Sequence, residues 1–319
     1  MNWLLEGTSY YSALSLRGME LVHPERWRVL SDDENSAALV KRRPTLDRVA
    51  VLISGGGANG PLFPGYVADG LADGAVVGAP YAAPNAYAIY EAGRYLGREK
   101  GVLLLYNNFA GDYLNNDMAQ ELLEMDGIAV ESAVCTDDIA SAIGEPRSCR
   151  SGRTGIALLI KLAGTCAGAG WSLGDTAAIV RRAGGRLGTL SVFTDPEQKH
   201  VTFGGGFSGE PGMLTVPVGT MEEAARQAAE LLLDDLVPRP GERCILLVNR
   251  MCLTSYGDGY RMARCAVEAL SARCPVLRTR VAGFSNIKDV YGFELSVLCA
   301  DRELADLLSE DICTDSFVL

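Results

Sequence analysis

The feature that most constrains the fold is a short apolar run that ends in a cluster of glycines. Residues 48–54 are almost entirely aliphatic, and residues 54–60 read Ser-Gly-Gly-Gly-Ala-Asn-Gly. A run this short and this apolar, closed by glycine, predicts a strand buried on both faces. Further apolar runs alternate with segments of helical spacing, which predicts strands at residues 75–78, 101–106 and 128–130 and helices at residues 85–96 and 117–124.

This alternation predicts a largely parallel sheet with helices on both faces. A similar pattern begins again after the polar residues 194–200, with helices expected at 221–233 and 259–271 and strands at 244–249 and 294–299. A length of 319 residues also suits two domains. We therefore expect an α/β protein of two α/β domains, residues 1–193 and 194–319, each with a central sheet flanked by helices. The first 45 or so residues suggest a helix followed by an irregular arm.

The composition argues against two classes of partner. The formal net charge is −11, from 29 basic and 40 acidic side chains, and such a surface repels nucleic acid and anionic membranes. No apolar stretch is long enough to span a bilayer, and residues 1–6 do not resemble a signal peptide, so we expect a cytoplasmic protein. A short basic cluster, Arg147, Arg150 and Arg153, is interpreted as a solvated loop.

Cysteine and histidine usage argues against a metal site. The nine cysteines are odd in number, widely spaced and without a Cys-x-x-Cys pair, which is untypical of a disulfide framework or a zinc site. Only two histidines occur, His23 and His200. We therefore expect no metal on this chain.

The glycine cluster after the first strand is the first candidate site. Backbone amides at Gly56, Gly57, Ala58, Asn59 and Gly60 can approach a polar ligand closely because glycines surround them. The segment is neither a Walker loop nor a dinucleotide fingerprint. A purely structural tight turn is nearly as well supported.

The second candidate site follows the strand expected at residues 101–106. Residues 107–112 read Asn-Asn-Phe-Ala-Gly-Asp, and Asp112 beside the amide of Asn107 could act as general base for a substrate hydroxyl. The alternative is that Asp112 caps a helix or turn. Because parallel sheets bind ligands at the carboxyl ends of their strands, residues 54–60 and 107–112 are expected to line one crevice.

The third candidate site is residues 203–212, which read Phe-Gly-Gly-Gly-Phe-Ser-Gly-Glu-Pro-Gly. So many glycines around Ser208 and Glu210 suggest backbone that lies against a ligand or another segment. The spacing does not match the Gly-x-Ser-x-Gly nucleophile elbow, which argues against serine-hydrolase chemistry.

Together, these segments resemble one family. The substrate-binding subunit of dihydroxyacetone kinases carries Ser-Gly-Gly-Gly-Ser-Gly-His-Glu-Pro, then Asn-Tyr-Thr-Gly-Asp-x-Leu-Asn, then Gly-x-Gly-Ile-His-Gly-Glu-Pro-Gly. The corresponding segments here are residues 54–61, 108–115 and 204–212, in the same order. Residues 136–139, 247–249 and 292–293 resemble further signatures of the family, so the resemblance covers nearly the whole chain.

The resemblance also implies site residues. In the family one histidine captures the carbonyl carbon of dihydroxyacetone covalently, and the matching position here is Ser208. A second histidine belongs to the first glycine loop, which is one residue shorter here and has no histidine near Asn59. A family lysine is matched by Asn107, whereas the family's catalytic aspartate is matched by Asp112. His23 matches a structural histidine, and a rescue role for His200 is the minority interpretation.

On this resemblance the leading hypothesis is a dihydroxyacetone-kinase-like subunit that binds a small ketose or polyol without covalent capture. No cofactor is expected on this chain, since in the family a separate nucleotide-binding kinase subunit supplies ATP with Mg. The alternative is a catalytically impaired pseudokinase subunit that acts as a regulator or co-activator. A changed reaction on a changed ligand, using Ser208 and Glu210, is a third hypothesis. The resemblance also implies a homodimer.

Overall fold

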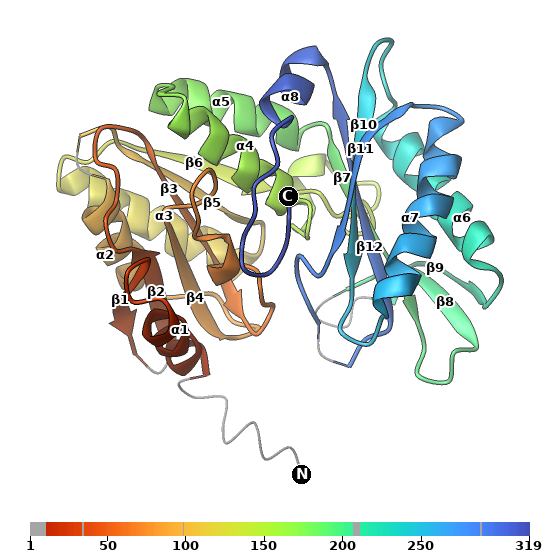
Figure 1. Ribbon diagram of the computed structural model, residues 1–319, viewed down its shortest axis with the longest axis horizontal. Helices are drawn as coiled ribbons and strands as arrows, with labels where there is room; N and C mark the ends of the chain where they lie inside the picture. The colour runs from red at the N-terminus through yellow and green to blue at the C-terminus, as the bar shows by residue number, and fades with distance from the viewer. Residues whose placement is uncertain (1–10, 34, 98, 207–210, 288) are drawn as a thin grey trace. The chain divides into compact units, whose positions relative to one another are not determined.

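The computed structural model describes residues 11–33, 35–97, 99–206, 211–287 and 289–319 (Figure 1). It divides the chain into two compact units: unit 1 is Met1–Val134 with Leu159–Arg181, and unit 2 is Cys135–Leu158 with Arg182–Leu319. The single boundary expected between residues 193 and 194 falls instead inside the strand β7, Leu187–Thr194. The polar residues that suggested a linker form the turn between β7 and the next strand of the same sheet.

Unit 1 contains a six-stranded sheet in the order β1-β2-β4-β3-β5-β6. Its strands are β1 Trp27–Asp32, β2 Ser36–Lys41, β3 Ala50–Gly57, β4 Gly74–Pro80, β5 Val102–Asn107 and β6 Val130–Cys135. The predicted parallel arrangement is confirmed for β4, β3 and β5. The expected irregular arm is wrong, because β1 and β2 form an antiparallel edge whose buried side chains complete the core.

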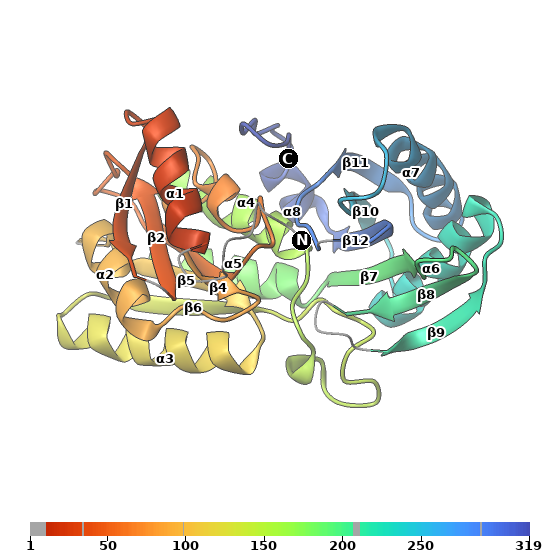
Figure 2. The same cartoon turned by 90° about the horizontal axis from the view of Figure 1, so that it is seen from below.

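Helices cover both faces of the unit 1 sheet. The helices α2 Ala86–Leu96 and α3 Ala110–Met125 pack on one face, over a core that includes Leu52, Leu104 and Leu123. The helix α1 Tyr11–Val22 lies on the opposite face (Figure 2). The helices α4 Ile156–Gly168 and α5 Leu173–Gly184 follow later in the chain. No helix in the described ranges is long and apolar enough to cross a membrane.

The start of α3 differs from the prediction in a way that bears on function. The sequence suggested a helix only from residue 117, after an asparagine-rich turn, but α3 begins at Ala110. The glycine and asparagines in this stretch are poor helix formers and misled the prediction. Asn116 lies on the inner side of the helix and donates to Ser54 and to the backbone oxygen of Asp112, and these contacts offset the weak helix propensity of this stretch.

Unit 2 contains a second six-stranded sheet in the order β11-β10-β12-β7-β8-β9. Besides β7, its strands are β8 His200–Gly205, β9 Pro211–Pro217, β10 Arg243–Arg250, β11 Val276–Ala282 and β12 Gly292–Ala300. Among the pairings in this sheet β10–β11 is parallel, and the others are antiparallel. The helices α6 Met221–Leu236 and α7 Tyr256–Ser271 pack on one face, and a short helix α8, Arg302–Leu307, follows β12. The helices and strands predicted for this part of the chain are confirmed to within a few residues.

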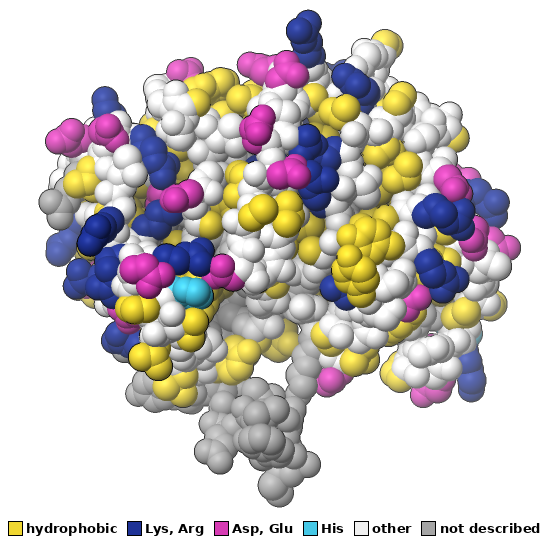
Figure 3. Space-filling view, viewed as in Figure 1, with side chains coloured by type: hydrophobic (Ala, Val, Ile, Leu, Met, Phe, Trp, Pro, Cys, Tyr) yellow, Lys and Arg dark blue, Asp and Glu magenta, His cyan; other side chains and the backbone are white. Residues whose placement is uncertain are grey.

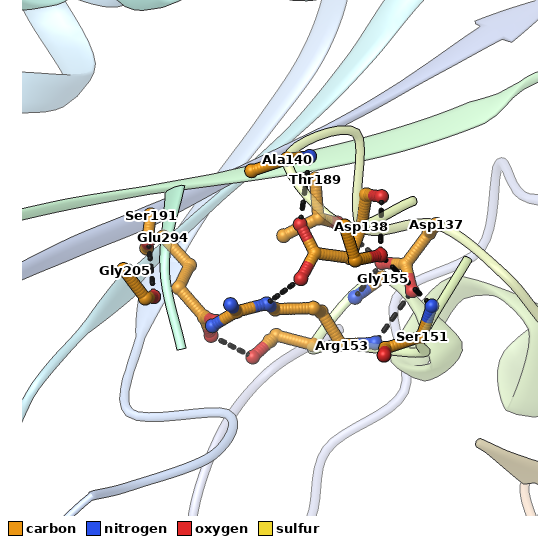
Figure 4. A network of polar contacts seen from close by, with 12 residues as sticks. Asp137, Asp138, Ala140, Ser151, Arg153, Gly155, Thr189, Ser191, Gly205 and Glu294 are labelled. Atoms are coloured by element: carbon orange, nitrogen blue, oxygen red, sulfur yellow. Dashed lines mark hydrogen bonds and ion pairs between the residues drawn. The ribbon is translucent and has the colours of Figure 1, made fainter. Parts of the chain in front are cut away.

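A network of buried polar side chains occupies unit 2, on the face of β12 that carries Glu294 (Figure 4). Arg153 is 2% exposed, and its guanidinium contacts Asp138 at 2.7 Å and Glu294 at 3.1 Å. The interpretation of the Arg147–Arg150–Arg153 cluster as a solvated loop is therefore wrong: Arg153 is buried, and Arg147 and Arg150 are partly buried and paired with Asp235. The correct partners were not evident from the sequence because Glu294 lies 141 residues further along the chain.

Segments that the sequence analysis singled out separately meet in this network. Asp137 accepts hydrogen bonds from the backbone amides of Arg153 and Gly155, at 2.6 and 2.9 Å. Asn249 donates to Glu294 at 3.1 Å and accepts from the backbone amide of Phe284 at 2.8 Å. Burial raises the pKa of Glu294 by desolvation, and the opposing effect of Arg153, whose guanidinium also contacts Asp138, does not cancel it. The network therefore depends on one cation to hold two buried carboxyl groups.

Replacing Arg153 by methionine should lower the free energy of unfolding by about 3–5 kcal/mol at neutral pH, because two buried carboxylates lose their partner. The loss should shrink as the pH falls, since the raised pKa of Glu294 lets protons replace the missing charge. Urea unfolding followed by circular dichroism measures both. The matched control is Arg302→Met, whose side chain is 92% exposed, with an expected change within about 0.5 kcal/mol. An equally small change for Arg153→Met would contradict the assigned role.

Candidate functional site

The glycine cluster is partly strand and partly loop. β3 extends through Gly57, and a Cβ at Gly55 would collide with the ring of Phe63. A Cβ at Gly57 would collide with the hydroxyl of Ser12 and the carbonyl oxygen of Gly78. At these two positions the structural interpretation accounts for glycine. Gly60 is exposed, with open space where a Cβ would lie.

The two candidate segments of unit 1 lie at the same edge of its sheet, as predicted. β3 and β5 are parallel neighbours, and Ser54 pairs with Tyr106 near the carboxyl ends of both strands. The loop after β4 joins them there: a Cβ added at Gly56 would lie 3.3–3.4 Å from backbone atoms of Tyr81 and Ala82, and one added at Gly111 would lie 3.1 Å from Ala83. Residues 54–60 and 107–112 therefore belong to one group of loops.

Asp112 is the third residue of α3 and points its carboxyl group into a buried environment. The helix is capped by Phe109, which makes no side-chain capping bond, so Asp112 is not the N-cap residue. The side chain is 5% exposed, and its Oδ1 atom has no hydrogen-bond partner among the residues that the structure describes. Burial raises the pKa of Asp112 from its ordinary value of 3.8 to about 7. This carboxyl group can therefore gain and lose a proton near neutral pH.

Asn116, which no pattern in the sequence singled out, links the backbone at Asp112 to the end of β3. Its Nδ2 donates to the backbone oxygen of Asp112 at 2.8 Å and to the hydroxyl of Ser54 at 2.9 Å. Asn116 is 1% exposed and connects the end of β3 to the first turns of α3. The spacing of four residues from Asp112 would have indicated this role had the helix been predicted from residue 110.

Three buried oxygen atoms in these segments lack partners among the described residues: Oδ1 of Asn59, Oδ1 of Asn107 and Oδ1 of Asp112. Leaving a buried polar atom unpaired costs about 1–3 kcal/mol, so such atoms are rare and call for an explanation. All three can accept hydrogen bonds. A ligand that brings several hydroxyl donors to this edge of the sheet would satisfy them.

The third candidate segment is described only in part. Ser208 and Glu210 lie outside the described residues. Just before them, Gly205 accepts a hydrogen bond from the hydroxyl of Ser191 at 2.7 Å. Gly204 adopts φ of +85°, and a Cβ there would collide with Ala140, so only glycine fits.

The two histidines have ordinary surroundings. His23 packs edge-on against Trp27, with ring centroids 5.2 Å apart. The ring of His200 contacts the carboxylate of Asp195 at 2.8 Å, and its side chain is 52% exposed. Across the described part of the chain, no three His, Cys, Asp or Glu side chains are grouped so that they could hold a metal ion.

Comparison with known proteins identifies the family. The sequence model of the Dak1 domain matches residues 17–316, which is nearly the whole chain. The chain therefore belongs to the Dak1 domain family. The family predicted from the three motifs is confirmed.

Curated members of the family include kinase subunits and larger kinases. The dihydroxyacetone-binding subunit DhaK of the PTS-dependent dihydroxyacetone kinase 2 of Listeria innocua is 28% identical, over 90% of each chain. The putative 3,4-dihydroxy-2-butanone kinase of Solanum lycopersicum is 31% identical over 82% of this chain, which spans 47% of that protein. Among solved structures, the dihydroxyacetone kinase of C. freundii has the same fold, with a TM-score of 0.89 at 23% identity, over 100% of this chain and 61% of that one.

Replacing Asp112 by asparagine should stabilise the protein at alkaline pH. The pKa of Asp112 is 3.8 in the unfolded chain and about 7 in the folded protein. The contribution of this carboxyl group to folding stability is therefore fully present below pH 3.8 and is lost as the pH rises toward 7. The asparagine side chain carries no charge to desolvate, so the gain over the wild type should grow to at most roughly 4 kcal/mol between about pH 4 and about pH 8.

Denaturant unfolding at several pH values measures the difference. The matched control is Asp117→Asn, which changes an exposed carboxylate on the same helix and should give a small difference that hardly varies with pH. A pH-independent effect of Asp112→Asn would show that the carboxyl group is not desolvated as described.

Proposed function

We propose that this chain is a dihydroxyacetone-kinase-like subunit that binds a small ketose or polyol non-covalently for phosphorylation. Asp112 orients and deprotonates the reacting hydroxyl, and a separate nucleotide-binding partner subunit supplies ATP with Mg. The observation that carries the proposal is the group of unpartnered buried oxygens at Asn59, Asn107 and Asp112 among the described residues. The relatives' names, dihydroxyacetone-binding subunit and 3,4-dihydroxy-2-butanone kinase, support ligands of this size and chemistry.

The donor pattern of the ligand follows from these atoms. The amide oxygens of Asn59 and Asn107 can only accept hydrogen bonds, and a deprotonated Asp112 accepts as well. A hydroxylated ketone carries several hydroxyl donors close together, which suits several acceptors at one sheet edge. An anionic ligand would be repelled by Asp112 once it is charged. The chemistry of these loops therefore favours a neutral polyhydroxy compound.

The pKa of Asp112 supports its role as the base. A general base is most effective when its pKa lies near the working pH, and burial raises the pKa of Asp112 to about 7. Phosphoryl transfer depends mainly on positioning and charge stabilisation, so one well-placed carboxylate with a partner's nucleotide suffices for turnover. Asn116 bonds to the backbone oxygen of Asp112 and to Ser54, which ties the start of α3 to the end of β3 beside this carboxylate.

Binding without a covalent bond follows from the resemblance at Ser208. A serine hydroxyl is a poor nucleophile unless a base activates it. His200 lies eight residues before Ser208. Its ring contacts the carboxylate of Asp195, and its side chain is half exposed. Recognition of the ketose then rests on hydrogen bonds, which suits the unpartnered oxygens in the described part of unit 1. A purely regulatory role would not require a buried carboxyl group with a pKa near neutral, so we place the kinase subunit first.

Calorimetric titration with dihydroxyacetone, and then with D- and L-erythrulose, should show saturable binding to the wild-type chain. With a nucleotide-binding kinase subunit and ATP supplied, Asp112→Asn should lower the phosphorylation rate by about 10²–10⁴-fold, the usual contribution of general base catalysis. Ketose affinity should change by only a few fold, because an amide still offers one oxygen to the ligand.

The matched control is Asp117→Asn, whose side chain lies at the surface of the same helix. It should leave binding and rate unchanged. Flat titrations with every ketose would contradict the binding function and favour a regulatory protein. A fully active Asp112→Asn variant would contradict the catalytic role of Asp112 alone.

A further inference from the structure

A separate pocket of about 770 Å³ lies wholly within unit 2. It is lined by one face of α7, by the end of β11 and by residues 316–318 near the end of the chain. Its size is in the range of pockets that hold small molecules. None of the residues assigned to the candidate site in unit 1 belongs to it.

Arg250 lines this pocket and carries an incompletely satisfied charge. One nitrogen of its guanidinium donates to the backbone oxygen of Thr254 at 3.0 Å, while its buried Nε has no partner among the described residues. Among the described residues, Arg250 forms no ion pair with a carboxylate. A part-buried guanidinium with an unused donor favours an anion from outside the chain.

The Arg250 side chain packs against α7 at a glycine, which lowers the stability of that helix. A Cβ at Gly259 would collide with the side chain of Arg250, so the helix needs glycine at this position. Glycine inside a helix is about 1 kcal/mol less favourable than alanine. Arg250 follows Val248 by two residues in β10 and therefore projects toward α6 and α7, where Val248 belongs to the core. The guanidinium is thus held between β10 and α7.

Arg280 supplies a second unused donor in the same pocket. Its Nε is also buried without a partner among the described residues. Its other nitrogens contact Asp311 and the backbone oxygen of Thr279, and Asp311 is shared with Arg278 at 2.5 Å. One carboxylate thus serves two guanidinium groups. Although the chain as a whole has a net charge of −11, this pocket is lined by Arg250, Arg264 and Arg280 against Glu268 and Asp311, a small excess of positive charge.

Aromatic and aliphatic side chains form the rest of the wall. Tyr256 and Tyr260 are 67% and 50% exposed, and their ring centroids lie 4.9 Å apart. The guanidinium of Arg250 lies 5.8 Å from the ring of Tyr256. Val267, Val281 and Phe317 add apolar surface. The space-filling view shows hydrophobic side chains gathered over α7, with basic side chains nearby (Figure 3).

We propose that this pocket binds a small organic anion with a flat apolar body and a single carboxylate or phosphate group. The anionic group bonds to Arg250, Arg280 adds positive charge to the lining of the same pocket, and the flat body packs against Tyr256 and Tyr260. Guanidinium groups recognise both carboxylate and phosphate oxygens by charge-assisted hydrogen bonds, so the two head groups share one chemistry. The site is independent of the ketose site, and its occupancy does not rest on the proposed function.

Four probes test the proposal on the full chain by calorimetry: phenyl phosphate, phenylacetate, inorganic phosphate and benzyl alcohol. At least one aromatic anion should bind saturably and more tightly than inorganic phosphate and the neutral alcohol. The tighter of the two aromatic anions identifies the head group. Binding should weaken as salt is added, because the contact is ionic.

Two variants locate the binding site. Arg250→Gln should weaken the aromatic anion about tenfold or more, the usual contribution of a charge-assisted hydrogen bond. Tyr256→Ala should also weaken it, and because this side chain is largely exposed, the variant should fold normally even if Arg250→Gln does not. The control is Arg302→Gln, which removes an exposed charge outside the pocket. Dihydroxyacetone titrations of the same variants keep the two sites apart, since neither change should affect them.

Failure of every aromatic anion to bind would overturn the proposal. Binding that is equally strong in Tyr256→Ala and Arg250→Gln would place the anion elsewhere and would also overturn it. The alternative occupant of this pocket is a surface of a second copy of the chain, and light scattering tests for it. A dimeric wild type that becomes monomeric in Tyr256→Ala would show that a protein surface fills this pocket instead of a small anion.

Discussion

Arg153 forms two buried ion pairs, with Asp138 and Glu294, and much of unit 2 depends on them. Charges taken out of water must be paired and hydrogen bonded, or the fold loses several kcal/mol. Here hydrogen-bond partners come from several elements: the loop after β6, the segment leading into α4, and strands β7, β10 and β12. Ser191 and Ala140, beside this network, also constrain Gly204 and Gly205 just before the glycine-rich segment around Ser208.

Whether buried polar groups have partners also distinguishes the candidate sites from the rest of the fold. In the network around Arg153 the carboxyl groups have partners, which marks it as structural. At the edge of the unit 1 sheet, Asn59, Asn107 and Asp112 keep buried oxygens without partners among the described residues. In the pocket beside α7, the unused groups are donors on Arg250 and Arg280. Acceptors in one place suit a hydroxylated ligand, and cationic donors in the other suit an anion.

Several features of the fold could be predicted because they depend on local patterns. The apolar run before the glycine cluster, the strand before Asn107 and the helix capped by Asn85 all appear close to where they were expected. The predictions failed where distant segments decide the outcome. The strands β1 and β2 were missed because their burial comes from the neighbouring β4, and α3 began early because Asn116 is buried against Ser54 of β3. Arg153 was predicted to lie at the surface because its partner Glu294 is far away in the sequence.

The sequence by itself determined the family, the α/β character and the order of the three glycine-rich motifs, because these are written in short stretches of chain. It also indicated Asp112 as the residue to test. Only the tertiary structure decided that Asp112 is buried with a pKa near 7, that Asn116 bonds to its backbone oxygen, and that Arg250 and Arg280 line one pocket. The physical reason is that desolvation and unpaired hydrogen-bonding groups arise from residues far apart in the chain, and no local pattern records which of them will meet.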